Sequence, residues 1–177
     1  MALLPILSAP HPVLSAKARK VRPDEFGADL LRLLDDMAET MYAAPGVGLA
    51  APQIGDSRRI VVADPGFEGE EGARRKGVDL VYMVNPEIIE AAPTKIKWEE
   101  SCLSVPDLAQ NVERSDKVVI RFQGADGAEH ERTYEGFSAV VMQHELDHLQ
   151  GVTLLEHSSL LKRTRYLQKQ KKKAGAR

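Results

Sequence analysis

The chain has 177 residues, of which 43% are hydrophobic, and a formal net charge of −2. This length and composition fit one globular domain with a sizeable core and exclude a largely disordered chain. The single cysteine excludes an intramolecular disulfide, and no apolar run approaches the roughly 20 residues of a membrane-spanning helix, so we expect a reducing cytosol and no membrane association.

The two ends of the chain differ from its body. The N-terminus has no basic residue before its short apolar patch and is interrupted by Pro5, Pro10 and Pro12, so no signal peptide is expected. Residues 158–177 hold eight Lys and Arg and no acid, which leaves 16 basic and 26 acidic residues, a balance of −10, in the rest. The basic C-terminal segment is therefore electrostatically separate from the body.

The first half of the chain predicts one helix. Residues 1–23 are interrupted by prolines and predicted to be extended, and Pro23, Asp24 and Glu25 are typical of a helix start. We expect an amphipathic helix from Asp24 to about Tyr42, because apolar residues recur there at helical spacing: Leu30, Leu31, Leu34, Met37 and Met41.

The middle of the chain predicts strands. Strand patterns cover residues 59–64, 81–86, 95–98, 116–122 and 130–134, with a hairpin at the Asp-Gly of 124–127 and an exposed loop over 65–77. A helix follows from Phe137, and a last helix from Leu160 to about Gln170, capped by Ser158 or Ser159, leads into a basic end. These elements predict a single α+β domain over residues 1–177, with a mixed or antiparallel sheet region and the Phe137 helix packed on it.

The helix that begins at Phe137 contains the pattern HExxH, from His144 to His148. Residues four apart lie on one face of a helix, so both imidazoles can bind one cation, and Glu145 can then handle the proton of a metal-bound water. An ordinary amphipathic helix with solvated or satisfied polar groups is the alternative.

Two further stretches stand out. Glu100–Ser104 holds the only cysteine, Cys102; a lone cysteine is more often a small buried hydrophobe, but with an HExxH it becomes a credible third ligand that leaves a fourth position open, as in a catalytic site. Gly46–Gly55 is a run of small residues with one amide side chain, which fits either a close backbone approach or a tight loop chosen for its turns.

Together, GVGLAAPQIG (46–55), ESCLS (100–104) and QHELDHLQG (143–151) closely resemble peptide deformylase, the enzyme that removes the N-terminal formyl group from nascent bacterial and organellar polypeptides. The resemblance spans nearly the whole chain and implies a compact α+β fold, a cytoplasmic enzyme of the bacterial type, and a formylated nascent peptide as substrate. It also implies one divalent ion held by Cys102, His144 and His148, with Fe²⁺ expected and Zn²⁺, Ni²⁺ or Co²⁺ as replacements. One departure is Ser101, where the family usually has Gly.

The resemblance also implies residue roles. It implies that a bound ion would activate a water for attack on the formyl carbon, and that Glu145 would carry the water's proton to the leaving amine, so that formate is released. The Gln53 side-chain amide and the Leu103 backbone N–H stabilise the oxyanion, with Gly48 near the same site.

The methionine side chain of the substrate needs an apolar pocket. Phe137, Val140 and Val141 share the helix face of His144 and can form its wall, although plain core packing explains them equally well. By resemblance, Val47 and Trp98 complete the pocket, and the peptide binds as an added strand.

The HExxH pattern and the basic segment also fit two other functions. A zincin-type peptidase takes a third ligand downstream of the HExxH, where only Glu156 and His157 are available, at unusual spacing. A non-catalytic ribosome-binding module would use its metal structurally, which Glu145 and the open fourth position argue against. The basic segment 158–177 is itself expected either to dock on ribosomal RNA or to serve solubility alone.

Overall fold

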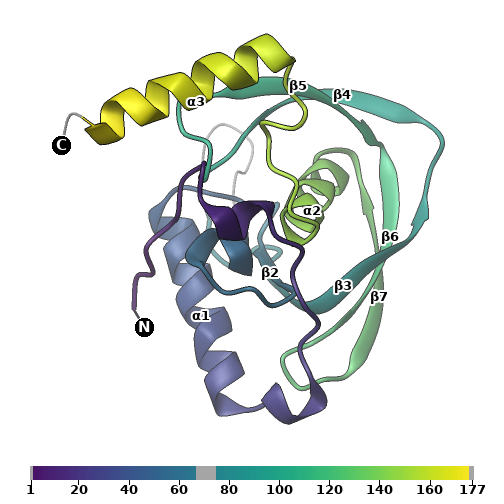
Figure 1. The fold of residues 1–177 in the computed structure, drawn as a ribbon. Coiled ribbons are helices and arrows are strands. Elements are labelled where there is room, and N and C mark those ends of the chain that lie inside the picture. Colours follow the sequence, from purple (N-terminus) through teal and green to yellow (C-terminus); the bar gives the residue numbers. More distant parts are fainter. Residues whose placement is uncertain (1, 67–74, 176–177) are drawn as a thin grey trace.

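A computed structural model describes residues 2–66 and 75–175 of the chain (Figure 1). Its α-helices are α1 (Ala28–Ala43), α2 (Gly136–Leu149) and α3 (Leu160–Gly175). Short 3-10 helices are η1 (Pro12–Ser15), η2 (Pro23–Glu25) and η3 (Ala51–Ile54). None of the described helices is long and apolar enough to cross a membrane.

The described strands form two antiparallel sheets. The larger has the order β1-β2-β3-β6-β7, made of Gly48–Ala50, Ile60–Ala63, Val81–Ala91, Lys117–Gln123 and Glu129–Glu135. The smaller pairs β4 (Lys95–Ser101) with β5 (Ala109–Ser115). Helix α2 contacts strands of both sheets, and Figure 1 shows it in the interior, with α1 and α3 on the outside. The predicted α+β class with an antiparallel sheet region is confirmed.

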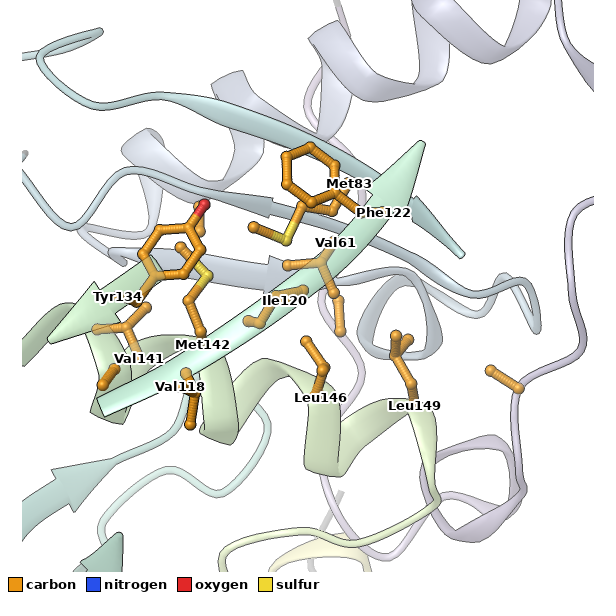
Figure 2. Packing of buried hydrophobic residues seen from close by; sticks show 14 residues of the cluster. Val61, Met83, Val118, Ile120, Phe122, Tyr134, Val141, Met142, Leu146 and Leu149 are labelled. Carbon is orange, nitrogen blue, oxygen red and sulfur yellow. The ribbon is translucent and has the colours of Figure 1, made fainter. Parts of the chain in front are cut away.

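The core that holds α2 against the larger sheet is apolar (Figure 2). Val61, Met83 and Ile120 project from the sheet toward Met142 and Leu146 of α2, and all five are buried. Burying a side chain of this size contributes about 1.5 to 3 kcal/mol each. This packing fixes the helix on its inner side, which leaves its other side free to line a site.

Several predicted boundaries were wrong. Helix α1 begins at Ala28 rather than Asp24, because Gly27 has φ of +149° and separates it from η2, the isolated turn at Pro23–Glu25. The short strand β1 and the polar strand β5 were missed: β1 lies in a glycine-rich run, and β5 (AQNVERS) lacks the apolar alternation of a strand. Helix α3 continues to Gly175 rather than ending near Gln170.

Other predictions hold. The turn between β6 and β7 contains Gly127 at φ +81°, and the carboxylate of Asp126 accepts a hydrogen bond from Ala128 N–H at 3.0 Å, so the Asp-Gly hairpin is confirmed. Ser159 caps α3, since its Oγ accepts from Lys162 N–H at 3.3 Å. Most of the predicted exposed loop 65–77 lies outside the described residues.

Candidate metal centre and active site

One cysteine sulfur and the imidazole nitrogens of two histidines lie close together in the structure. Helix α2 presents His144 and His148 with ring centroids 5.1 Å apart, and Cys102 reaches them from the loop after β4. The candidate ligand atoms of these three residues lie within 4.8 Å of one another, and Cys102 Sγ is 3.3 Å from His148 Nε2. The two histidines of HExxH and the cysteine far from them in sequence therefore form one cluster.

The cluster fits a divalent transition-metal ion. A thiolate and two imidazoles are ligands that Fe²⁺, Zn²⁺, Ni²⁺ and Co²⁺ all accept, and three protein ligands leave a position for a reactant. Burial lowers the pKa of His148 well below its usual range, which keeps this imidazole neutral and able to bind a metal. Burial also lowers the pKa of His144, but its interactions with Cys102 and Glu100 outweigh that effect and raise it, so a cation must displace a proton there.

A carboxylate outside the cluster orients His144. His144 Nδ1 lies 2.7 Å from Glu100 Oε2, which leaves His144 Nε2 to face the cluster. Glu100 is held in turn by Arg114, whose Nε and Nη2 donate to it at 2.8 and 3.0 Å, while Nη1 donates to Asp147 at 2.6 Å. No sequence pattern predicts a role for Glu100, Arg114 or Asp147. The only signal for them is the general rule that a metal-binding histidine has an outer hydrogen-bond partner.

Glu145 is buried beside the three candidate ligands. Its side chain is 4% exposed, and Oε2 has no hydrogen-bond partner among the described residues. Burial raises its pKa to about 7, and the nearby His144 opposes that rise. A Cβ added at Gly48 would lie 2.7 Å from Glu145 Cδ, so only glycine leaves room for this carboxyl group. Gly48 therefore belongs to a close backbone approach rather than to a simple turn.

Gln53 reaches the same point from η3. Its Oε1 accepts a hydrogen bond from Ala50 N–H at 2.8 Å, which fixes the direction of the amide. Its Nε2 donates to Ser104 Oγ at 3.2 Å and lies 3.8 Å from Cys102 Sγ. A buried amide donor is thus already aimed at the metal cluster.

A cleft of about 300 Å³ opens beside these groups. Its apolar wall includes the Trp98 and Phe137 rings, with centroids 5.3 Å apart. The predicted site residues that line it are Val47, Gly48, Gln53, Trp98, Cys102, Leu103, Phe137, Val140, Val141, His144 and Glu145. His148 lies beneath the cleft and is 1% exposed. Val141 lines the cleft and also packs in the core on the sheet, so its core packing is shown and its role in a substrate pocket stays a prediction.

The family model described as Polypeptide deformylase matches residues 3–164 of the chain. The chain belongs to the polypeptide deformylase family. A peptide deformylase of Phenylobacterium zucineum is 46% identical over 176 residues, which cover 99% of each chain. One of Agrobacterium fabrum is 41% identical over 177 residues, which cover 100% of this chain and 99% of the relative.

Solved structures of deformylases share the fold. A peptide deformylase from Legionella pneumophila superposes with a TM-score of 0.84 at 37% identity, and the match covers 99% of both chains. One from Thermotoga maritima gives 0.80 at 37% identity and covers 90% of this chain and 99% of that one. As a family member, the chain is a deformylating hydrolase and a metalloenzyme.

The contacts of Glu156 and His157 do not support the peptidase alternative. His157 Nε2 lies 2.8 Å from Asp147, and Glu156 accepts from the Thr153 hydroxyl at 2.7 Å, so both downstream candidates are engaged away from the cluster. The third donor comes from Cys102, upstream of the helix. Ser101, at the end of β4, is exposed and lines the cleft.

Proposed function

We propose that the enzyme removes the formyl group from formyl-methionyl nascent chains in the bacterial cytoplasm, with a divalent ion held by Cys102, His144 and His148. The observation that carries the proposal is the position of Glu145. A buried carboxyl group, one oxygen of which has no hydrogen-bond partner in the described part of the chain, lies directly beside a three-donor cluster that borders the cleft. That combination suits hydrolysis better than a closed structural site.

When bound, the ion supplies a water of lowered pKa and polarises the formyl oxygen. Glu145 accepts the proton of the attacking water and delivers it to the leaving nitrogen, so that formate and a free α-amine result. Its burial suits this exchange, because a carboxyl group with a pKa of about 7 is neither a permanent base nor a permanent acid at neutral pH.

Two donors stabilise the negative charge that develops on the formyl oxygen. We assign these roles to Gln53 Nε2 and the Leu103 backbone N–H. Gln53 is oriented before the substrate arrives, because Ala50 N–H holds its carbonyl oxygen. Donors preorganised in this way act without reorganisation and typically contribute about 2.7 to 4 kcal/mol each to the barrier reduction.

The substrate's methionine side chain fits the apolar part of the cleft. Val47, Trp98, Phe137, Val140 and Val141 supply its walls, and Gly48 lets the reacting group approach Glu145. Within the described residues, β4 pairs with β5 along one edge, while its residues 98–101 line the cleft. An extended peptide can add to β4 as a further strand. In a similar structure, a peptide deformylase of Acinetobacter baumannii with 34% identity and a TM-score of 0.81 is described as bound to Met-Ala-Ser.

We propose Fe²⁺ as the native ion, with Zn²⁺, Ni²⁺ and Co²⁺ as competent replacements. The mixed sulfur and nitrogen donor set accepts all four, so availability rather than geometry decides among them. Metal analysis of protein purified without oxygen tests this point.

We also propose that α3 docks on ribosomal RNA. The segment 158–177 carries eight basic residues and no acid. Arg165, Lys171 and Lys172 have no ion-pair partner among the described residues, so they are available for phosphates.

The decisive assay measures formate released from formyl-Met-Ala-Ser by the metal-loaded protein, beside amine release from unformylated Met-Ala-Ser. Formate release without peptide cleavage is expected. Cleavage of the unformylated peptide without formate would contradict the proposal.

A further inference from the structure

One continuous N-terminal segment contacts all three motifs of the site. We call residues 7–18 the N-terminal clasp. Figure 1 shows this part of the chain, in purple, running beside α2 before it turns toward α1. Its main-chain N–H groups donate to Gln53 in η3, to the loop of Cys102 and to the end of α2.

The first two contacts join η3 and the loop after β4, the two segments that carry the proposed oxyanion donors. Leu7 N–H donates to Gln53 O at 2.7 Å, and Ala9 N–H donates to Ser104 O at 2.8 Å. Gln53 Nε2 also donates to Ser104 Oγ at 3.2 Å. Because Leu7 and Ala9 are only two residues apart, the clasp sets how far apart the Gln53 and Ser104 backbones can lie.

The third contact ties the clasp to the metal-binding helix. Ala18 N–H donates to Leu149 O at 3.0 Å, one residue beyond His148. Close by, a Cβ at Gly151 would lie 2.7 Å from Ser15 C and O, so the glycine that ends the QHELDHLQG motif is pressed against the clasp backbone.

The clasp is packed as well as hydrogen-bonded. Leu14 is 1% exposed and belongs to the same buried cluster as Ala9 and Cys102, while Ala18 belongs to the cluster of Leu149. Backbone bonds in such buried surroundings are costly to leave unmade, so they hold their geometry.

We propose that the N-terminal clasp positions the active site: the N–H groups of Leu7, Ala9 and Ala18 fix Gln53, the Cys102 loop and α2 relative to one another. This inference rests on the proposed oxyanion roles of Gln53 and Leu103. None of the clasp residues lines the cleft. Their effect is on the spacing of groups that do, where a small misplacement is expressed in the rate of the chemical step.

The test replaces single backbone N–H groups with ester oxygens by ribosomal incorporation of α-hydroxy acids. Leu7→leucic acid removes the donor to Gln53 O and keeps the side chain. Leu3→leucic acid is the matched control, because Leu3 N–H has no hydrogen-bond partner among the described residues. Ala18→lactic acid removes the donor to Leu149 O. All proteins are loaded with Ni²⁺ and assayed on formyl-Met-Ala-Ser at a temperature where circular dichroism shows them folded.

We expect kcat of the Leu7 and Ala18 esters to fall about 3- to 10-fold, the change that the loss of one hydrogen bond produces. KM and metal content should stay within two-fold of the Leu3 control. In the Co²⁺-loaded proteins, the visible bands that report ligand geometry should shift for the Ala18 ester and not for the Leu3 ester. A fully folded Leu7 ester with the kcat of the Leu3 ester would overturn the proposal, as would an unchanged Co²⁺ spectrum for the Ala18 ester.

A Gln53→Ala variant distinguishes failure of the clasp proposal from failure of the proposed oxyanion role of Gln53. If Gln53→Ala lowers kcat while the Leu7 ester does not, the clasp fails and the oxyanion assignment stands. If Gln53→Ala leaves kcat unchanged in an active enzyme, the oxyanion assignment fails, and the clasp as a device for placing that donor fails with it.

Discussion

His144 Nδ1 and Glu100 Oε2 lie 2.7 Å apart in a nearly closed environment, with the Glu100 side chain 3% exposed. This contact fixes the ring of one proposed metal ligand, and two hydrogen bonds from the Arg114 guanidinium fix the Glu100 carboxylate in turn. Burial raises the pKa of Glu100, but Arg114 and His144 outweigh it and lower the pKa to about 2, so the group is a carboxylate at neutral pH. The proposed metal centre therefore depends on a charged residue outside its three-donor cluster.

Glu100→Gln is expected to weaken metal binding about 10- to 100-fold, the usual effect of removing an outer partner of a metal-binding histidine. The neutral amide keeps the shape of the side chain and loses its charge, so His144 is held less firmly. Competition with a coloured chelator measures the affinity. Glu99→Gln is the matched control, because Glu99 precedes Glu100 in the chain but is exposed and has no ion pair within the described part of the chain. Equal affinities for the two variants would contradict the assigned role.

Glu145→Ala is expected to keep its metal and to lose deformylation by at least about 100-fold, the range of a general acid or base. The residue is buried next to the ligands but supplies no ligand atom to the cluster. Metal content by elemental analysis and formate release are measured on the same sample. Near-normal turnover at full metal content would rule out the proton-transfer role.

Cys102→Ala should lose metal affinity and activity together. It removes one of the three donors that lie within 4.8 Å of one another. Cys102→Ser is a useful companion, since its smaller and harder oxygen donor keeps the polarity but is a poorer ligand for these ions. One ion bound per chain with unchanged affinity in Cys102→Ala would show that the three-ligand arrangement is wrong.

The site was easier to predict from the sequence than the boundaries of the fold. His144 and His148 are four residues apart on one helix, so local geometry alone places them together. Cys102 is 42 residues before His144, so local geometry cannot place it beside the histidines. Its donor chemistry made it a credible third ligand, and the resemblance to a family assigned it to the same site. The long-range partner Arg114 has no local signature, because its role depends on how β5 lies beside α2.

The wrong boundaries have physical causes of the same kind. The acids and proline at residues 23–25 are typical of a helix start, yet they form their own 3-10 turn before Gly27. Strand β5 forms because β4 pairs with it along seven residues, from Lys95–Ser115 to Ser101–Ala109. Tertiary pairing thus decided an element whose own sequence is polar.

The iron form is expected to lose activity in air, while the nickel and zinc forms survive longer. A thiolate bound beside Fe²⁺ at a site open to a cleft is exposed to oxidation, and Cys102 lines that cleft. Half-lives of formate release are compared for the three forms, with and without a peroxide scavenger. Equal half-lives for the iron and nickel forms under both conditions would count against this expectation.

The final prediction concerns the two sets of cations on α3. Lys169 and Lys173 pair with Asp107 at 3.3 and 3.0 Å, and Lys162 donates to Gln110 at 3.1 Å, so these three are already engaged with the body. A second set, the unpaired cations, has no such partner among the described residues: Arg165, Lys171 and Lys172.

If α3 docks on ribosomal RNA, replacing the three unpaired cations with Gln should weaken cosedimentation with ribosomes and reduce its salt dependence by about one unit of log–log slope per residue. The matched control, Lys162, Lys169 and Lys173 all replaced with Gln, should change ribosome binding less, because those cations are engaged with Gln110 and Asp107. Turnover of formyl-Met-Ala-Ser should stay unchanged in the first variant, since its side chains lie outside the cleft. Equal cosedimentation of wild type and the first variant at low salt would exclude docking through this face and leave the basic segment with a role in solubility.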